Sequence, residues 1–150
     1  MPTEQYAEEN LIRMADYTAN VDRLANVARS ILDEVDKRSA FFDNGLFGDP
    51  VWYILLDLYI HAAERRTVSV SSLCVAARVP ATTALRWINN LTNRGLLERF
   101  SDPSDRRRAH IRLSRAAHEQ MSAYLAMIES DRGLREPAKA LFRQPPLSPG

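Results

Sequence analysis

The strongest constraint on the fold is a pair of short helical segments within residues 69–93. Ser69 is the expected cap at the start of the first segment, because a serine hydroxyl readily accepts hydrogen bonds from the free N–H groups of a first helical turn. This segment ends near Ala77. Val79-Pro80 forms a turn, and apolar residues then recur at helical spacing through residues 81–93. The inner face of this second helix is expected to hold four residues: Ala84, Trp87, Ile88 and Leu91.

A β-hairpin is predicted directly after the two helices. Residues 97–100 and 109–113 alternate apolar and polar side chains with the period of a strand, and residues 101–105 between them favour a turn. Gly95 lies just after the second helix, where a left-handed residue is needed and glycine adopts it most easily. Two short helices, a tight turn and a hairpin together make a winged helix.

Further helices are predicted on both sides of this unit. Residues 11–35 form a long amphipathic helix, and the aromatic stretch 40–48 is interpreted as a packed loop. Asp49-Pro50 opens another helix with a capping residue and a proline at the first helical position. Ser114 caps a last helix that runs to about Ile128. The expected fold is mainly α with a small β-hairpin wing.

Charge is divided unevenly along a chain whose formal net charge is only +1. Residues 1–50 hold ten carboxylates and five cations, whereas residues 78–115 hold nine arginines and three carboxylates. The second segment is therefore a candidate surface for a polyanion. Arginine suits such a surface, because its planar guanidinium makes paired contacts to phosphate or guanine.

The second helix of a helix-turn-helix lies in the major groove of DNA, where its first residues contact base edges. Arginine, asparagine and threonine side chains are suited to this contact. The outward residues predicted to make it are Ala81, Thr82, Thr83, Arg86, Asn89 and Asn90. Serine hydroxyls at the start of the preceding helix are expected to contact phosphates: Ser69, Ser71 and Ser72. The hairpin tip carries three arginines suited to a narrow minor groove: Arg106, Arg107 and Arg108.

Residues 68–114 resemble the winged helix of MarR-type regulators. The resemblance is carried by the wing segment Asp102-Pro103, Asp105-Arg106-Arg107 and by Leu113-Ser114 after it. It implies that Asp105 braces the hairpin and that Arg107 enters the minor groove. The chain departs from the family at Arg78, where a glycine is usual, and at Pro80, where a capping Ser or Asp is common.

The resemblance also implies a homodimer whose N- and C-terminal helices interleave. Four apolar residues of the first helix are the expected dimerisation stripe: Leu24, Ala28, Ile31 and Val35.

The chain then divides into an N-terminal dimerisation helix and loop (1–48), a winged helix-turn-helix (49–114), a C-terminal helical region (115–142) and a disordered tail (143–150). The tail holds three prolines in eight residues.

These features predict a sequence-specific regulator of transcription, with repression as its expected mode, that binds double-stranded DNA as a homodimer on an inverted-repeat operator. A site for a small aromatic ligand between the dimer arms and the winged helix is a further possibility. Five aromatic residues could line it: Phe41, Phe42, Phe47, Trp52 and Tyr53. The same residues fit a core around the loop equally well. A winged helix used for protein–protein assembly is the alternative function.

Other classes of function find little support in the sequence. Histidines 61, 110 and 118 share no metal-ligand spacing with one another or with Cys74, and no catalytic or phosphate-binding motif is present, so we expect neither an enzyme nor a cofactor. Cys74, Trp52 and Trp87 are interpreted as core residues. A single cysteine and the lack of an apolar run of about 18 residues predict a cytoplasmic protein without a membrane span.

Overall fold

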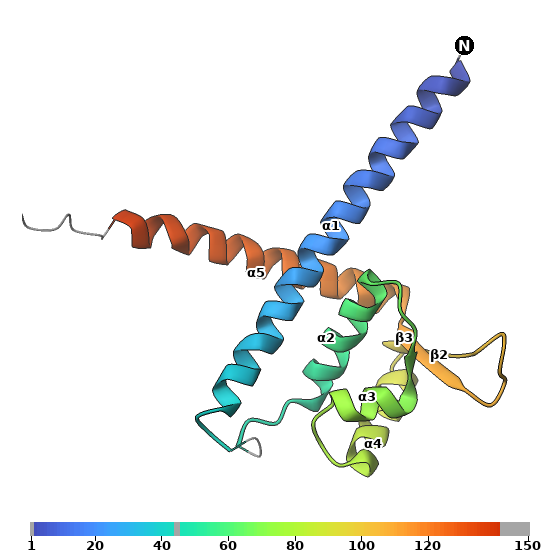
Figure 1. Cartoon of the computed structure of the whole chain (residues 1–150), viewed down its shortest axis with the longest axis vertical. Helices are drawn as coiled ribbons and strands as arrows, with labels where there is room; N and C mark the ends of the chain where they lie inside the picture. Colours follow the sequence, from blue (N-terminus) through green and yellow to red (C-terminus); the bar gives the residue numbers. More distant parts are fainter. Residues whose placement is uncertain (1, 44–45, 142–150) are drawn as a thin grey trace, which may run out of the picture.

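The structure, a computed structural model, describes residues 2–43 and 46–141. Helices dominate it, and a small antiparallel sheet lies beside them (Figure 1). The elements in chain order are α1 (Pro2–Ser39), α2 (Pro50–Ala63), β1 (Val68–Ser69), α3 (Val70–Ala76), α4 (Ala81–Asn93), β2 (Leu97–Ser101), β3 (Ala109–Leu113) and α5 (Arg115–Leu141). The predicted fold class, mainly α with a β-hairpin wing, is confirmed.

The first helix is longer at both ends than the predicted 11–35. It begins at Pro2 and ends at Ser39. Apolar periodicity underestimates its length because residues 2–10, which include three Glu, one Gln and one Ala, favour a helix without forming a continuous apolar face. Residues 4–20 are all exposed, and this half of α1 extends far beyond the other elements (Figure 1).

The second helix begins as predicted. The backbone N–H of Trp52 donates to the Asp49 carboxylate over 3.2 Å, and Pro50 occupies the first helical position. The loop before it differs from the prediction, because its aromatic rings are not packed. Phe41 is 84% exposed, and Phe42 and Phe47 contact each other edge to face while both remain exposed.

The two short helices have the predicted bounds, and their turn has an unusual backbone. Ser69 caps α3 by accepting the N–H of Ser72 over 3.1 Å. Arg78, between α3 and α4, has a left-handed φ of 59°, and Gly95 after α4 has the expected left-handed φ of 76°. The prediction that Trp87 is a core residue is wrong, since it is 38% exposed on α4.

The sheet has three strands rather than the predicted two, in the order β1-β3-β2. β2 and β3 form the hairpin, with Leu97 opposite Leu113. β1 pairs Val68 with Ile111 and so attaches the start of α3 to the hairpin. A strand of two residues has no readable periodicity, which explains why the sequence does not reveal it.

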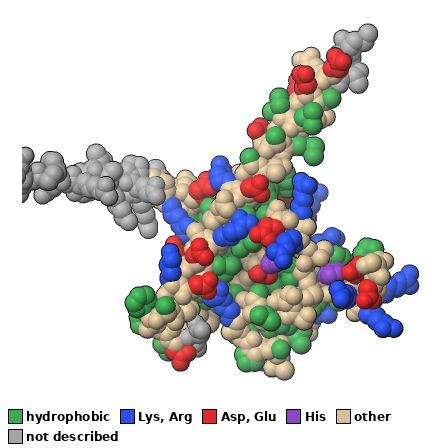
Figure 2. All heavy atoms as spheres, viewed as in Figure 1, with side chains coloured by type: hydrophobic (Ala, Val, Ile, Leu, Met, Phe, Trp, Pro, Cys, Tyr) green, Lys and Arg blue, Asp and Glu red, His purple; other side chains and the backbone are tan. Residues whose placement is uncertain are grey.

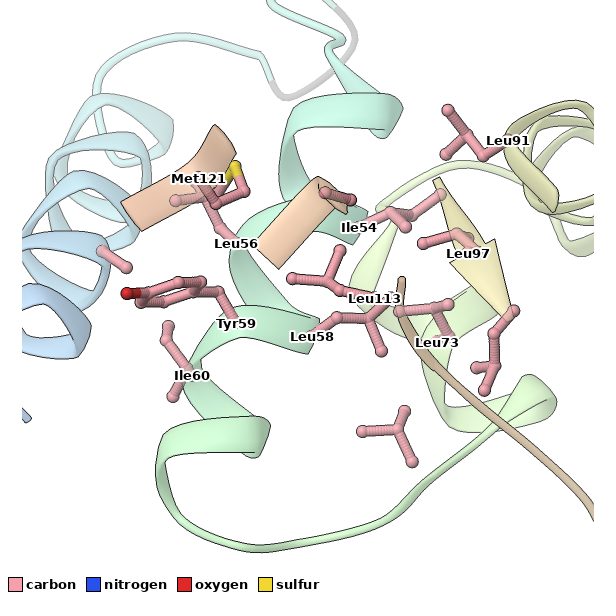
Figure 3. Packing of buried hydrophobic residues seen from close by; sticks show 14 of the residues in the cluster. Ile54, Leu56, Leu58, Tyr59, Ile60, Leu73, Leu91, Leu97, Leu113 and Met121 are labelled. Atoms are coloured by element: carbon pink, nitrogen blue, oxygen red, sulfur yellow. The ribbon is translucent and has the colours of Figure 1, made fainter. Parts of the chain in front are cut away.

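One hydrophobic core joins the hairpin, the short helices and the long helices (Figure 3). Leu73, Leu91 and Leu97 pack beside Ile54 of α2 in this view. The Tyr59 hydroxyl forms a 2.8 Å hydrogen bond with Ser122, which ties α2 to α5. Cys74 is buried in this core, as predicted.

The core also includes part of the predicted dimerisation stripe. Leu24 is 2% exposed and Ala28 is fully buried, both within the cluster formed by this chain alone. The expectation that these two residues meet a second copy is therefore corrected, because α2 and α5 of the same chain already cover that face of α1. Ile31 and Val35, further along, are half-buried.

The last helix continues well beyond its predicted end near Ile128, to Leu141. Ser114 caps it as expected, accepting the N–H of Ala117 over 3.2 Å. The predicted disordered tail, 143–150, lies outside the described residues. Within the described ranges, no helix combines the length and the apolar character that a membrane span requires.

Candidate DNA interface

Helix α4 presents its polar face to solvent and its apolar face to the core. Ala84, Ile88 and Leu91 are buried. Of the residues predicted to contact bases, Thr83 is half-buried and the others are exposed: Ala81, Thr82, Arg86, Asn89 and Asn90. Neither Arg86 nor Asn90 has a side-chain hydrogen bond or ion pair among the described residues, so both are available to a ligand.

The sequence analysis missed a residue beside this face. Arg99 of β2 donates a hydrogen bond from its guanidinium to the Asn89 side-chain oxygen. The alternation of β2 contains a signal for this contact, since Arg99 lies two residues after the buried Leu97 and so on the same face of the strand. The bond fixes the Asn89 side chain and brings a further cation to the edge of α4.

The serine cluster at the start of α3 is already bonded within itself. The Ser69 hydroxyl contacts that of Ser71 at 3.2 Å and that of Ser72 at 2.9 Å, in addition to its capping bond. Ser71 and Ser72 are exposed, while Ser69 is half-buried. The structure thus places Ser69 as a cap and leaves the other two facing solvent.

The wing tip, residues 102–108, is held by its own carboxylates. The Asp105 carboxylate accepts the backbone N–H of Arg107 over 3.0 Å and lies 3.9 Å from Arg108 Nε. The side chains of Arg106 and Arg107 have no hydrogen bond or ion pair in the described part of the chain. Basic side chains accordingly extend from the tip at the right of Figure 2.

A second carboxylate, that of Asp102, holds the base of the tip, a role that the sequence alone did not assign to it. Asp102 accepts the hydroxyl and the backbone N–H of Ser104, at 2.7 and 2.9 Å, and lies 3.2 Å from Nε2 of the buried His110. These hydrogen bonds, those of Ser104 first, hold the pKa of Asp102 well below its usual range. Phe100 covers the His110 ring at 5.5 Å. These contacts attach the base of the wing tip to the two strands of the hairpin.

The arrangement separates a basic end from an acidic arm. α3 and α4 lie at the end of the molecule opposite the N-terminus, and the wing projects beside them (Figure 1). A projecting helix with a neighbouring basic hairpin matches two adjacent grooves of a duplex. No group of three or more His, Cys, Asp or Glu side chains that could hold a metal is found among the described residues.

The aromatic residues considered for a small ligand lie around a hollow next to the loop. Phe42, Phe47 and Tyr53 line a cavity of about 340 Å³ together with Arg38 and Arg78. Trp52 lines an adjoining hollow of about 500 Å³. Phe41 lines neither of the two.

Comparisons with known proteins agree with this geometry. Residues 48–117 match the family described as winged helix DNA-binding domain. No curated protein sequence is similar to the chain. The structure is similar to that of S. aureus MepR in a MepR–DNA complex, with a TM-score of 0.52 and 18% identity, over 88% of this chain and 93% of the other.

A second solved structure, that of a mutant of S. aureus MepR, has a TM-score of 0.50 and 18% identity over 87% of this chain and 82% of that chain. At such identity the likeness extends to the fold and no further. The winged helix fold that the resemblance implied is confirmed at that level. Residues 48–117 therefore match a winged helix DNA-binding domain, and the chain shares the overall fold of S. aureus MepR.

Proposed function

We propose that this protein is a sequence-specific regulator of transcription that binds double-stranded DNA as a homodimer on an inverted-repeat operator. The observation that carries the proposal is a set of three arginines without partners among the described residues, Arg86 on α4 and Arg106 and Arg107 on the wing tip, at the end of the molecule away from the α1 arm. Unpaired guanidinium groups are available to phosphates and base edges. We call α4 the recognition helix from here on.

Three residues of the recognition helix support specific reading of bases. Thr82, Asn90 and Arg86 together offer hydroxyl, amide and guanidinium groups to base edges. The exposed Ser71 and Ser72 lie in the first turn of α3 and would donate to phosphates. Repression is the mode we propose, since an operator-bound dimer blocks other proteins without a further contact.

The salt dependence of DNA binding tests this proposal against the assembly alternative. Affinity for random duplex should fall steeply between about 50 and 200 mM salt, because each neutralised phosphate releases counterions. The triple variant Arg86→Ala, Arg106→Ala, Arg107→Ala should lose most of this binding and keep the helical content of the parent. An assembly module would bind duplex weakly at both salt concentrations, and that result would contradict the proposal.

The homodimer is supported by an apolar stripe of α1 that continues past the core of its own chain. The stripe repeats with alternating steps of three and four residues: Met14, Tyr17, Val21, Leu24, Ala28, Ile31 and Val35. This spacing is typical of helices that pack against another helix. Its second half is covered within the chain, whereas Met14 and Tyr17 are 68% and 65% exposed.

A second copy is the occupant we propose for the exposed half of this stripe. A lone helical arm with large apolar side chains in water is unfavourable, and a symmetric partner offers an identical arm to cover it. α5 also extends away from the core and crosses α1 (Figure 1), with exposed Tyr124 and Met127 along its length. Interleaved α1 and α5 helices would bury both sets of side chains.

A response to a small aromatic ligand is a second proposal, supported by the hollow beside the loop. Its lining combines the Phe42, Phe47 and Tyr53 rings with the Arg38 guanidinium, which lies 4.7 Å from the centre of the Phe47 ring. Rings favour an aromatic ligand, and the cation favours an acidic group on it. Isothermal titration with benzoate and with benzyl alcohol tests this, since only the anion should bind. Equal binding of both, or of neither, would contradict it.

A further inference from the structure

Arg78 has a backbone conformation that its residue type disfavours. It lies in the turn between α3 and α4 with φ at 59°, in the left-handed region that favours glycine. Its side chain is nevertheless held by two neighbours. The guanidinium is 2.7 Å from the Asp36 carboxylate and lies over the Tyr53 ring, 5.1 Å from its centre.

These contacts join the helix proposed for dimerisation, α1, to the turn that precedes the helix proposed to read DNA, α4. Asp36 lies in the last turn of α1, Tyr53 in the first turn of α2, and Arg78 at the turn that leads into the recognition helix. Among the described residues, the pair of Arg78 and Asp36 is the only ion pair that joins α1 to the two short helices and their turn, residues 70–93. The turn is thus tied directly to the C-terminal end of α1, the helix whose exposed N-terminal half is the proposed dimer arm.

We propose that Arg78 is a positioning residue that fixes the orientation of the recognition helix relative to α1. This inference rests on the proposed function. In a homodimer built on α1, the orientation of each recognition helix relative to its arm sets the separation of the two helices, and therefore the spacing of the half-sites that they fit. Arg78 then acts on spacing without contacting a base.

The location of the Arg78 guanidinium distinguishes this role from a phosphate contact. It faces a carboxylate and an aromatic ring beside the loop hollow, whereas Arg106 and Arg107 of the wing tip face solvent without partners among the described residues. Neutralising Asp36 gives an independent test, because the two explanations predict opposite changes in DNA affinity. Removing a carboxylate should strengthen DNA binding if only overall charge matters. If Asp36 holds Arg78 in place, neutralising it should weaken binding to the correctly spaced operator.

The experiment compares Arg78→Gly, Asp36→Asn and the double variant with the parent. Arg65→Gly is a matched control, because Arg65 also has a left-handed φ, of 55°, while its side chain has no hydrogen bond or ion pair among the described residues. Each protein is titrated with the preferred operator and with operators whose half-sites are one base pair closer or further apart. Thermal midpoints and salt slopes are measured alongside.

We expect Arg78→Gly and Asp36→Asn each to lose at least fivefold in affinity for the preferred spacing and to discriminate less between spacings. The double variant should lose no more than the larger single loss, because both changes break one contact. Arg65→Gly should keep the spacing preference. The thermal midpoint of Arg78→Gly should be unchanged or higher, since glycine adopts the left-handed turn freely.

Three results would overturn the inference alone. One is a spacing preference retained within twofold by both single variants. Another is stronger operator binding by Asp36→Asn. The third is a salt slope that falls by about one unit in Arg78→Gly, which would make Arg78 a phosphate contact. A parent protein that shows no preference for any duplex would instead overturn the proposed function, and this inference with it.

Discussion

Arg99 of the wing is bonded to Asn89 of the recognition helix, guanidinium to side-chain oxygen. An asparagine that reads adenine uses its oxygen and its amide together. Because Arg99 occupies the oxygen of Asn89, the two side chains form one unit whose amide and guanidinium groups would together meet the duplex in the proposed complex. The wing and the recognition helix therefore share a contact in the proposed DNA-facing surface.

A double-mutant cycle on this pair tests that relationship. Asn89→Ala and Arg99→Ala should each weaken binding to the selected operator, and their effects should be non-additive by about 0.5 kcal/mol or more, as for residues in contact. Affinities from fluorescence anisotropy at fixed salt provide the measurement. Strict additivity would show that the two side chains act independently on DNA.

Much of the fold follows from local sequence signals. The caps at Ser69, Asp49 and Ser114 and the glycine after α4 are local chemistry, and each occupies its predicted place. The N-terminal half of α1 is exposed and has no face that packs within the chain, so periodicity underestimates this helix. The size of Trp87 favours a core position, but its place on α4 leaves it partly in solvent.

The candidate site likewise has a part that the sequence predicts and a part that it does not. The exposed polar positions of α4 follow from helical spacing, because the apolar positions identify the opposite face. The contacts between Arg99 and Asn89 and between Arg78 and Asp36 join residues from separate elements. Such pairs depend on how the elements pack: strand alternation indicates only which face of β2 Arg99 lies on, and the sequence does not identify its partner or that of Arg78.

Arg107→Ala should test the contribution of the wing tip to affinity. Loss of one phosphate or minor-groove contact weakens binding to all duplexes alike and lowers the salt slope by about one unit. Arg115→Ala is the matched control, since Arg115 is a highly exposed arginine at the start of α5 that pairs with Glu119. Unchanged binding by Arg107→Ala at moderate salt would contradict the proposed groove contact.

Two substitutions on α1 should separate dimerisation from folding. Met14→Asp places a charge in the exposed half of the stripe, and we expect a folded monomer by light scattering. Ile31→Asp buries a charge against the chain's own core, so it should lower the free energy of unfolding by about 3 kcal/mol.

Ala19→Asp, an exposed change elsewhere on the helix surface, provides the control and should remain dimeric. A Met14→Asp protein that is still a dimer of normal stability would place the interface elsewhere.

His118 should make stability depend on pH. Its ring stacks on Tyr59 at 4.8 Å, and burial lowers its pKa below the ordinary 6.5 despite the opposing charge of Glu119. The unfolded chain therefore takes up a proton more readily than the folded one, and stability should decrease as the pH falls below 6.5.

Urea denaturation at pH 7.5 and 5.5 measures this effect. His118→Phe keeps a stacked ring without a titrating group, so its midpoint should fall less over the same interval. Equal decreases in the parent and the variant would assign the pH dependence to other groups.

Selection of bound sequences from a random duplex pool tests the central claim most directly. A two-fold dimer that displays two recognition helices should select an inverted repeat with half-site centres about 10 base pairs apart. A·T-rich flanks should accompany it, because the minor groove narrows there and attracts the wing arginines. Arg86→Ala should relax the preference at one symmetric pair of positions, at a cost of about 1–3 kcal/mol. A direct repeat, or a single half-site bound by a monomer, would contradict the account.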